Sequence, residues 1–327
     1  MARFRIALGA LLLGLLVWGA SGEVSKAAPL RLAVQQTGTV AWELDVMRTH
    51  GLDKQAGLDL RIVRQASPEA GKIALRGGSA DVIVSDWLWV SRERSLGAKL
   101  VFYPYSSALG AVMVPADSPI RSLADLQGKT LAVAGGPIDK SWLLLQGVAA
   151  KQGIDLKDKA KIVYGAPALL AGKMVQGEMD AMLNYWNFCA RLEAQGFRRL
   201  VGIEDVLPAF GVSPQLPMIG YVFTESFARA HRRTVAAFLD ATRKAKEILR
   251  TSDAEWERIA PLTGAKDAAT LKAYRERYRE GIPQRPVEAD ARDAAVLYRV
   301  LAELGGKELV GEATELARGT FYVPPPQ

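Results

Sequence analysis

Cysteine and histidine are scarce in this sequence of 327 residues, which contains one cysteine, Cys189, and two histidines, His50 and His231. A lone cysteine cannot form an intrachain disulfide, and so few residues cannot supply a Cys/His metal site. Neither histidine lies near Cys189 or near a serine at a predicted strand end, so a nucleophile would lack a base. No phosphate-binding loop or dinucleotide fingerprint occurs either. We therefore expect no metal, no cofactor and no enzymatic activity.

Charge of one sign is not concentrated in any segment, although the formal net charge is +7. The densest basic groups, at 229–250 and 272–279, alternate with apolar and acidic positions, as the solvated faces of amphipathic helices do. A nucleic-acid surface needs a basic stripe with aromatic residues for stacking, and the sequence has none. Binding of nucleic acid is therefore not expected.

Long hydrophobic runs are missing, apart from one near the N-terminus. There Arg3 and Arg5 precede an apolar run over 6–17, and small residues follow, which is typical of a secretory signal peptide. A run of about 12 residues is too short to cross a bilayer, where about 20 are needed. We expect residues 1–28 to be removed, with 20–22 and 25–27 both suitable for cleavage, and the mature chain to be a soluble periplasmic monomer.

The length suits two lobes of about 100–200 residues each. Predicted strands alternate with predicted helices, which indicates mostly parallel sheets with right-handed crossovers. Strands are expected at 30–34, 58–63, 80–84, 99–103, 110–114, 130–134, 161–164, 180–183 and 218–223, and helices at 40–55, 68–76, from 138, at 166–176, 227–250, 254–260, 268–280 and 287–304. This order places one lobe at 29–114 plus 217–327, including the C-terminal helices, and the other at 115–216.

One local pattern occurs in both predicted lobes. The spacing Gly-x-x-Asp-x-x-x-Ser at 78–85 recurs as Gly-x-x-Asp-x-x-x-Asn at 177–184. A pair of similar sheets that face each other would produce such a repeat.

A predicted strand at 130–134 leads through Gly135-Gly136-Pro137 into a helix. Pro137 suits the first helical turn, where its missing N–H costs nothing. Free backbone N–H groups at such a helix start can bind an anionic or polar ligand group. Many α/β folds contain this arrangement, so it leaves the function open.

The residues around that turn carry a resemblance to a known family. Leu123-Ala-Asp-Leu-Gln-Gly-Lys-Thr-Leu-Ala-Val resembles the opening of the second lobe in bacterial solute-binding proteins of the nitrate, sulfonate, taurine and thiamine-precursor superfamily. The phrase Ala74-Leu75-x-x-Gly-x-x-Asp-Val-x-x-Ser resembles the first lobe of the same proteins. The resemblance implies an α/β fold, the type II periplasmic binding protein, with a ligand cleft between two lobes.

The same resemblance implies a function. Such proteins are the extracytoplasmic solute-binding subunits of ABC importers; they close on a solute and deliver it to a membrane permease and its ATPase. The turn over 135–139 lacks the hydroxyl-rich opening that is common in sulfonate binders, and the tryptophan content exceeds what a small inorganic anion needs. We therefore expect a small organic solute.

Ligands of open α/β sheets bind beyond the carboxyl ends of the strands. The strand ends so predicted lie at 35–39, 65–67, 85–87, 135–142, 165–167 and 184–187, and tryptophan there can stack on a flat or cationic ligand. The expected ligand-binding residues are Thr39, Trp42, Ser85, Asp86, Trp87, Gly136, Ser141, Trp142, Asn184, Tyr185 and Trp186, with Asn187 as a further amide. The alternative for each tryptophan is that it packs its helix against the sheet.

Three charged residues fall at the same strand ends. Lys140 could pair with a carboxylate, sulfonate or phosphate, and Asp86 or Asp139 with an amine. The alternative is that Asp139 lies in a first helical turn, where the dipole favours it without a ligand, and that Lys140 is solvated. For Lys140 the solvated position is the preferred interpretation.

Two other functions stay open. The superfamily includes a pyrimidine-precursor synthase that resembles the transport proteins and relies on a cysteine-rich segment and a histidine; residues 185–189 lie in a comparable region but contain one cysteine. A periplasmic accessory or sensor protein that binds a protein partner is the third possibility, and an exposed apolar patch on the outer faces would favour it.

Overall fold

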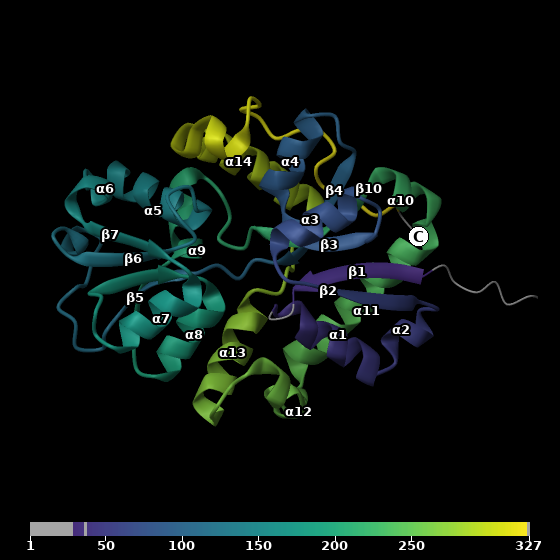
Figure 1. The fold of residues 1–327 in the computed structure, drawn as a ribbon, viewed down its shortest axis with the longest axis horizontal. Coiled ribbons are helices and arrows are strands. Elements are labelled where there is room, and N and C mark those ends of the chain that lie inside the picture. Colours follow the sequence, from purple (N-terminus) through teal and green to yellow (C-terminus); the bar gives the residue numbers. More distant parts are fainter. Residues whose placement is uncertain (1–28, 36–37, 326–327) are drawn as a thin grey trace, which may run out of the picture.

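Two five-stranded sheets form the framework of the computed structural model, which describes residues 29–35 and 38–325 (Figure 1). The predicted signal peptide lies outside the described residues. The strand order of the first sheet is β2 (Asp59–Gln65), β1 (Pro29–Gln35), β3 (Val82–Asp86), β10 (Ile219–Thr224), β4 (Leu100–Ser106), and that of the second is β7 (Lys161–Gly165), β6 (Thr130–Ala134), β8 (Ala181–Asn184), β5 (Ala111–Val114), β9 (Arg198–Gly202).

The two sheets have the same topology. In each, the first three strands are parallel and the fourth, β10 or β5, is antiparallel to both of its neighbours. The chain crosses from β4 into the second sheet and returns through β10, so both sheets are mixed. An antiparallel fourth strand allows the chain to leave and re-enter a sheet without a helical crossover.

The repeated sequence pattern has a structural cause. Gly78 and Gly177 both have a positive φ, of 69° and 76°, at the turn before a strand. Three residues later, the carboxylate of Asp81 accepts the N–H of Arg31 at 2.8 Å, and that of Asp180 accepts the N–H of Thr130 at 2.7 Å. Each aspartate thus joins the start of one parallel strand to the start of its neighbour.

Helices cover both sheets (Figure 1). They are α1 (Val40–Thr49), α2 (Leu52–Gln55), α3 (Pro68–Arg76), α4 (Trp87–Ser95), α5 (Lys140–Lys151), α6 (Leu156–Lys159), α7 (Pro167–Val175), α8 (Trp186–Ala194), α9 (Ile203–Val206), α10 (Glu225–Ala230), α11 (Arg232–Thr251), α12 (Asp253–Thr263), α13 (Ala268–Glu280) and α14 (Val287–Val310), with short 3-10 turns at Ala124–Leu126 and Leu207–Phe210. The predicted helix over 40–55 is divided because Gly51 adopts a left-handed φ of 63°. The prediction missed α4, α6, α8, α9 and β9.

The C-terminal helices reach both lobes. As expected, α11 and α12 pack against α1 of the first sheet, but α13 also packs along α8, and α14 contacts both α4 and α5. One hydrophobic core accordingly includes Trp87 below the first sheet, Trp142 below the second and Tyr298 of α14. Among the described residues, no helix has the length and hydropathy to cross a membrane.

Candidate functional site

The carboxyl ends of the parallel strands in the two sheets carry side chains that meet each other. Asp86 follows β3 of the first sheet and Lys140 follows β6 of the second, and Asp86 Oδ2 lies 3.2 Å from Lys140 Nζ. Trp42 in α1 and Trp186 in α8 make an edge-to-face contact with ring centroids 6.0 Å apart. We refer to the space between these strand ends as the cleft.

Asp86 is the N-cap of α4. Its carboxylate accepts the N–H of Trp89 at 2.8 Å, and it shares its other oxygen with the Lys140 ammonium. Burial acts to raise the pKa of Asp86, but the ammonium of Lys140, the N–H of Trp89 and the charge of Lys72 together outweigh it and lower that pKa. The preferred interpretation of Lys140 as a solvated residue is therefore wrong, because its side chain spans the cleft.

Asp139 caps α5 in the same way. Its Oδ1 accepts the N–H groups of Ser141, at 2.9 Å, and Trp142, at 3.3 Å. The chain's own carboxylate thus takes up N–H groups at the helix start where the sequence predicted an anionic or polar ligand group. Burial raises the pKa of Asp139, and the neighbouring Lys140 only partly offsets this.

Gly135 and Gly136 make room for this cap. Both have a positive φ, of 95° and 145°. A Cβ on Gly135 would lie 2.8 Å from Asp139 Oδ2 and 2.9 Å from the hydroxyl of Tyr185. The glycine pair therefore allows the carboxylate and the tyrosine to approach the backbone.

Two tyrosines contact the first turn of α5 and its cap. Tyr185, after β8, places its hydroxyl 3.3 Å from Asp139 Oδ2, and burial and that carboxylate raise the tyrosine's pKa, so the hydroxyl stays protonated and donates. Tyr164, at the end of β7, accepts the indole N–H of Trp142 at 3.1 Å. Tyr185 is 38% exposed and Tyr164 39%. The sequence analysis did not select Tyr164, although it ends a predicted strand.

An aromatic cluster joins the lobes on the other side of the cleft. Trp42 packs on Trp256, Tyr274 and Tyr278 of the C-terminal helices, at centroid distances of 5.6 to 6.1 Å. Trp186 contacts the same two tyrosines. Sequence reasoning missed these residues because nothing in the helical spacing of Tyr274 and Tyr278 says which partner they face.

Ionic contacts between α8 and α13 reinforce the cluster. Both carboxylate oxygens of Glu193 accept hydrogen bonds of 2.9 Å from the guanidinium of Arg277. Arg191 donates to the hydroxyl of Tyr274 from two nitrogens, at 3.2 and 3.0 Å. Bidentate pairs of this kind fix geometry as well as adding energy.

Thr39 lies at the start of α1 beside a buried polar network. Its hydroxyl lies 3.3 Å from that of Tyr105. One turn further, the fully buried carboxylate of Glu43 forms an ion pair with Lys246 and accepts a hydrogen bond from Tyr221. Residues 36–37, which precede Thr39, lie outside the described residues.

Four of the predicted ligand-binding residues are buried beneath the cleft. Trp87 and Trp142 are 0% and 1% exposed, and the indole N–H of Trp87 donates to the carbonyl of Pro217 at 3.0 Å. Ser85 is buried within β3, and the amide of Asn184 bridges Pro167 and Tyr185. The structure therefore places these four side chains as supports of the site rather than on its surface.

The remaining predicted residues lie at the cleft. They are Thr39, Trp42, Asp86, Gly136, Ser141, Tyr185 and Trp186, of which Trp42 and Gly136 are buried, and Asp139, Lys140 and Tyr164 join them. Asn187 is half-buried in the first turn of α8.

Cys189 and the histidines are placed apart from these groups. Cys189 has no exposed surface, and its thiol donates to the carbonyl of Asn184 at 3.2 Å. Burial raises the pKa of the thiol to about 12, so it is a poor source of thiolate. His50 pairs with Glu255 at 3.2 Å on the outer helices.

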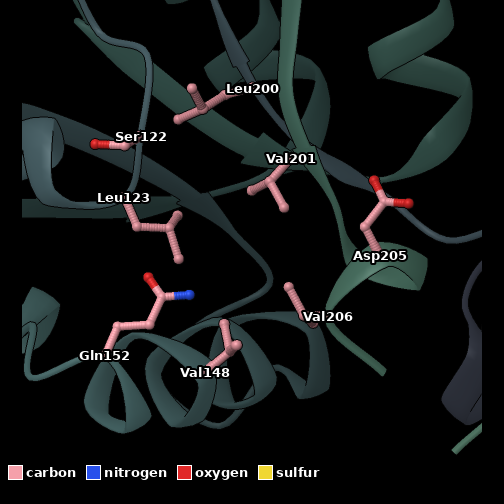
Figure 2. Close-up of a pocket in the computed structure, with 8 residues that line it drawn as sticks. All are labelled: Ser122, Leu123, Val148, Gln152, Leu200, Val201, Asp205 and Val206. Carbon is pink, nitrogen blue, oxygen red and sulfur yellow. The ribbon is translucent and has the colours of Figure 1, made fainter. Parts of the chain in front are cut away.

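A separate cavity of about 290 Å³ lies at the opposite edge of the second lobe (Figure 2). Leu123, Val148 and Val201 point toward one another across it, and Ser122, Gln152, Leu200, Asp205 and Val206 complete the lining. Val148 and Gln152 belong to the far end of α5 from Asp139. The cavity contains none of the predicted ligand-binding residues.

Comparison with known proteins identifies the family and the fold. The model of the family described as NMT1/THI5 like matches residues 46–254. Among solved structures, the periplasmic aliphatic sulphonate-binding protein SsuA from Escherichia coli aligns with a TM-score of 0.73 at 21% identity, over 91% of this chain and 92% of that one. A search of curated protein sequences finds no match.

Two further structures are similar. The alkanesulfonate-binding protein SsuA from Xanthomonas axonopodis pv. citri, bound to MOPS, gives a TM-score of 0.66 at 19% identity, over 91% of this chain and 99% of that one. A DszB mutant in complex with biphenyl-2-sulfinic acid gives 0.59 at 16% identity, over 88% and 95%. The fold is that of type II periplasmic binding proteins, which confirms the predicted fold class.

Proposed function

Because the chain belongs to the NMT1/THI5-like family, we propose that it is the extracytoplasmic solute-binding subunit of an ABC importer and captures a small organic solute by closure of two lobes. The observation that carries the proposal is the meeting of both sheets' strand ends through the Asp86–Lys140 pair and the Trp42–Trp186 contact. These are the ends at which α/β sheets bind ligands. Solved structures of sulfonate-binding proteins with this fold favour the same role.

The proposal includes the organisation and the partners of the chain. The lobes comprise 29–114 plus 217–327 and 115–216, and the signal peptide over 1–28 is removed on export to the periplasm. The mature monomer delivers its solute to a membrane permease with its ATPase. The solute contacts we propose are the seven predicted residues at the cleft, together with Asp139, Lys140 and Tyr164.

Contacts between the lobes give closure a physical basis. A solute that touches both lobes adds its binding energy only when the strand ends are close, so it shifts the population toward the closed form. The Arg277–Glu193 pair joins α13 to α8, and the Asp86–Lys140 pair joins the strand ends themselves. These pairs would hold the closed arrangement and limit how far the lobes separate.

Thermal melts of the mature chain test the proposal. The protein is unfolded and refolded to remove any carried solute, then melted with sulfonates, nitrate, pyrimidines, aromatic acids and amines. A solute at a hundred times its dissociation constant adds about 2.7 kcal/mol, which for a chain of this size raises Tm by roughly 5 °C or more. Small-angle scattering with the active solute should show a smaller radius of gyration.

A matched pair of variants locates the binding. Trp186→Ala removes a half-buried ring from the cleft and should abolish the shift. Tyr322→Ala removes a half-buried ring that packs on Phe223, at the edge of the first sheet opposite the cleft, and should leave the shift intact. A well-folded protein that responds to no solute would contradict the proposal and favour the partner-binding alternative.

A further inference from the structure

Two of the helices that begin at the cleft, α4 and α5, have N-terminal N–H groups engaged by carboxylates of the chain itself. Asp86 caps α4 and Asp139 caps α5. In a protein that holds an anion at such a position, these N–H groups and the positive end of the helix dipole would face the ligand. At the starts of α4 and α5 an anionic solute would meet these two carboxylates instead.

Lys140 forms an ion pair with Asp86 but not with Asp139. Its ammonium lies 3.2 Å from Asp86. Asp139 forms no salt bridge within the described part of the chain; its contacts are the two N–H groups of α5 and the hydroxyl of Tyr185. Burial raises the pKa of Asp139 even beside Lys140, which means that the desolvation of this carboxylate is not fully compensated.

Two partly exposed tyrosines lie near the start of α5: Tyr185 contacts Asp139, and Tyr164 contacts Trp142. Tyr164 and Tyr185 come from the strands that neighbour β6, and more than a third of each is exposed. Trp186, which directly follows Tyr185 in the chain, makes an edge-to-face contact with Trp42. Aromatic faces attract ammonium groups, and a carboxylate among them supplies the counter-ion.

Resting on the proposed function, we infer that the solute is an organic ammonium compound, with Asp139 as its counter-ion and the rings of Tyr164 and Tyr185 as its walls. The ammonium group of the solute takes the place of the water that burial removes from the Asp139 carboxylate. The Lys140–Asp86 pair stays intact, because neither partner is needed to neutralise the solute.

Three probes that share a benzyl group test this charge preference: benzylammonium, benzyl alcohol and phenylmethanesulfonate, with choline and 1,4-diaminobutane as further cations. Calorimetric titration of the refolded mature chain should show saturable binding of at least one cation. Benzylammonium should bind more tightly than the alcohol, and the sulfonate should not bind.

Asparagine replacements separate charge from helix capping. Asp139→Asn keeps a side-chain oxygen for the N–H groups of α5 and removes the negative charge, so cation binding should weaken about 10- to 100-fold. Asp155→Asn makes the same change at the exposed N-cap of α6, away from the cleft, and should leave cation binding unchanged. Tyr185→Leu should weaken cation binding about two- to fivefold more than Tyr185→Phe, which keeps the aromatic ring and removes only the hydroxyl.

The outcomes distinguish this inference from the function on which it rests. Binding of phenylmethanesulfonate that is lost in Lys140→Met would overturn the ammonium inference and leave the solute-binding function standing. So would binding of any anionic or neutral solute when no cation binds. Equal cation affinity of the wild type and Asp139→Asn would also refute it. A chain that binds none of the cations and nothing in the wider solute panel would overturn both proposals.

Discussion

The stability of the Asp290→Asn variant relative to the wild type should be greater at alkaline pH than at acidic pH. Asp290 lies in the first turn of α14 with no exposed surface, and neither of its oxygens has a hydrogen-bond partner within the described residues. The nearest cation, Arg285, lies 3.5 Å from Oδ1 and is closer to Asp293, at 2.7 Å. Burial therefore raises the pKa of Asp290 from 3.8 to about 7.

The sign follows from proton linkage. Between pH 3.8 and about 7 the folded state binds a proton at Asp290 that the unfolded state has released, so stability falls as the pH rises through this window. The pKa differs by about 3 units between the folded and unfolded states, so the full loss of unfolding free energy is roughly 4 kcal/mol. Part of it has already occurred at pH 5, so about 3 kcal/mol of it is lost between pH 5 and pH 9. Asparagine does not titrate and avoids this loss.

Urea unfolding at pH 5 and pH 9, followed by fluorescence and circular dichroism, measures the effect. The difference in unfolding free energy between Asp290→Asn and wild type should rise by about 3 kcal/mol from the lower to the higher pH. Asp117→Asn, at an exposed loop position, serves as the control and should show no such rise. A difference that is the same at both pH values would refute the reasoning, whatever its sign.

Two further predictions concern the buried ion pair and the glycine turn. Glu43→Gln removes the carboxylate that pairs with Lys246, whose pKa burial already lowers, and should lower the free energy of unfolding by about 3–5 kcal/mol in denaturant titrations. The double variant Glu43→Gln/Lys246→Met should recover most of that loss. A loss under about 1 kcal/mol in the single variant would contradict the role of the pair. Gly135→Ala, whose Cβ would press on Asp139, should cost roughly 1–3 kcal/mol and weaken solute binding, whereas Gly153→Ala, with a similar positive φ but open space, should leave binding intact.

The strands and their order along the chain could be predicted because apolar runs and glycine turns are local signals. The strand at 130–134 and the helices at 68–76 and 268–280 have the predicted bounds. The repeated Gly-x-x-Asp pattern also carried real information, since both aspartates hold the starts of parallel strands. The helix α4 was missed because its apolar residues do not fall on one face: Trp87, Leu88 and Val90 are all buried.

The cleft could be predicted only in part, because its contacts join residues far apart in the chain. Lys140 looked solvated because its partner, Asp86, precedes it by 54 positions and belongs to the other lobe. Trp87 and Trp142 looked like cleft residues because the strand-end position alone does not say whether a ring turns toward the ligand or beneath the sheet. That choice depends on which helix packs there, and α14, far along the chain, covers Trp87.

Equivalent positions of the two lobes explain the asymmetry of the cleft. The repeated pattern ends in Ser85-Asp86-Trp87 in one lobe and Asn184-Tyr185-Trp186 in the other. Asp86 caps its own helix, but Tyr185 has no side-chain acceptor for α8, and its hydroxyl instead donates to the carboxylate that caps α5. Trp87 is covered by α14, whereas its counterpart Trp186 crosses to Trp42. One backbone plan, with different residues at matching positions, thus gives the first lobe an acidic wall paired to Lys140, and the second a carboxylate between exposed rings. It is this second wall that we propose selects the charge of the solute.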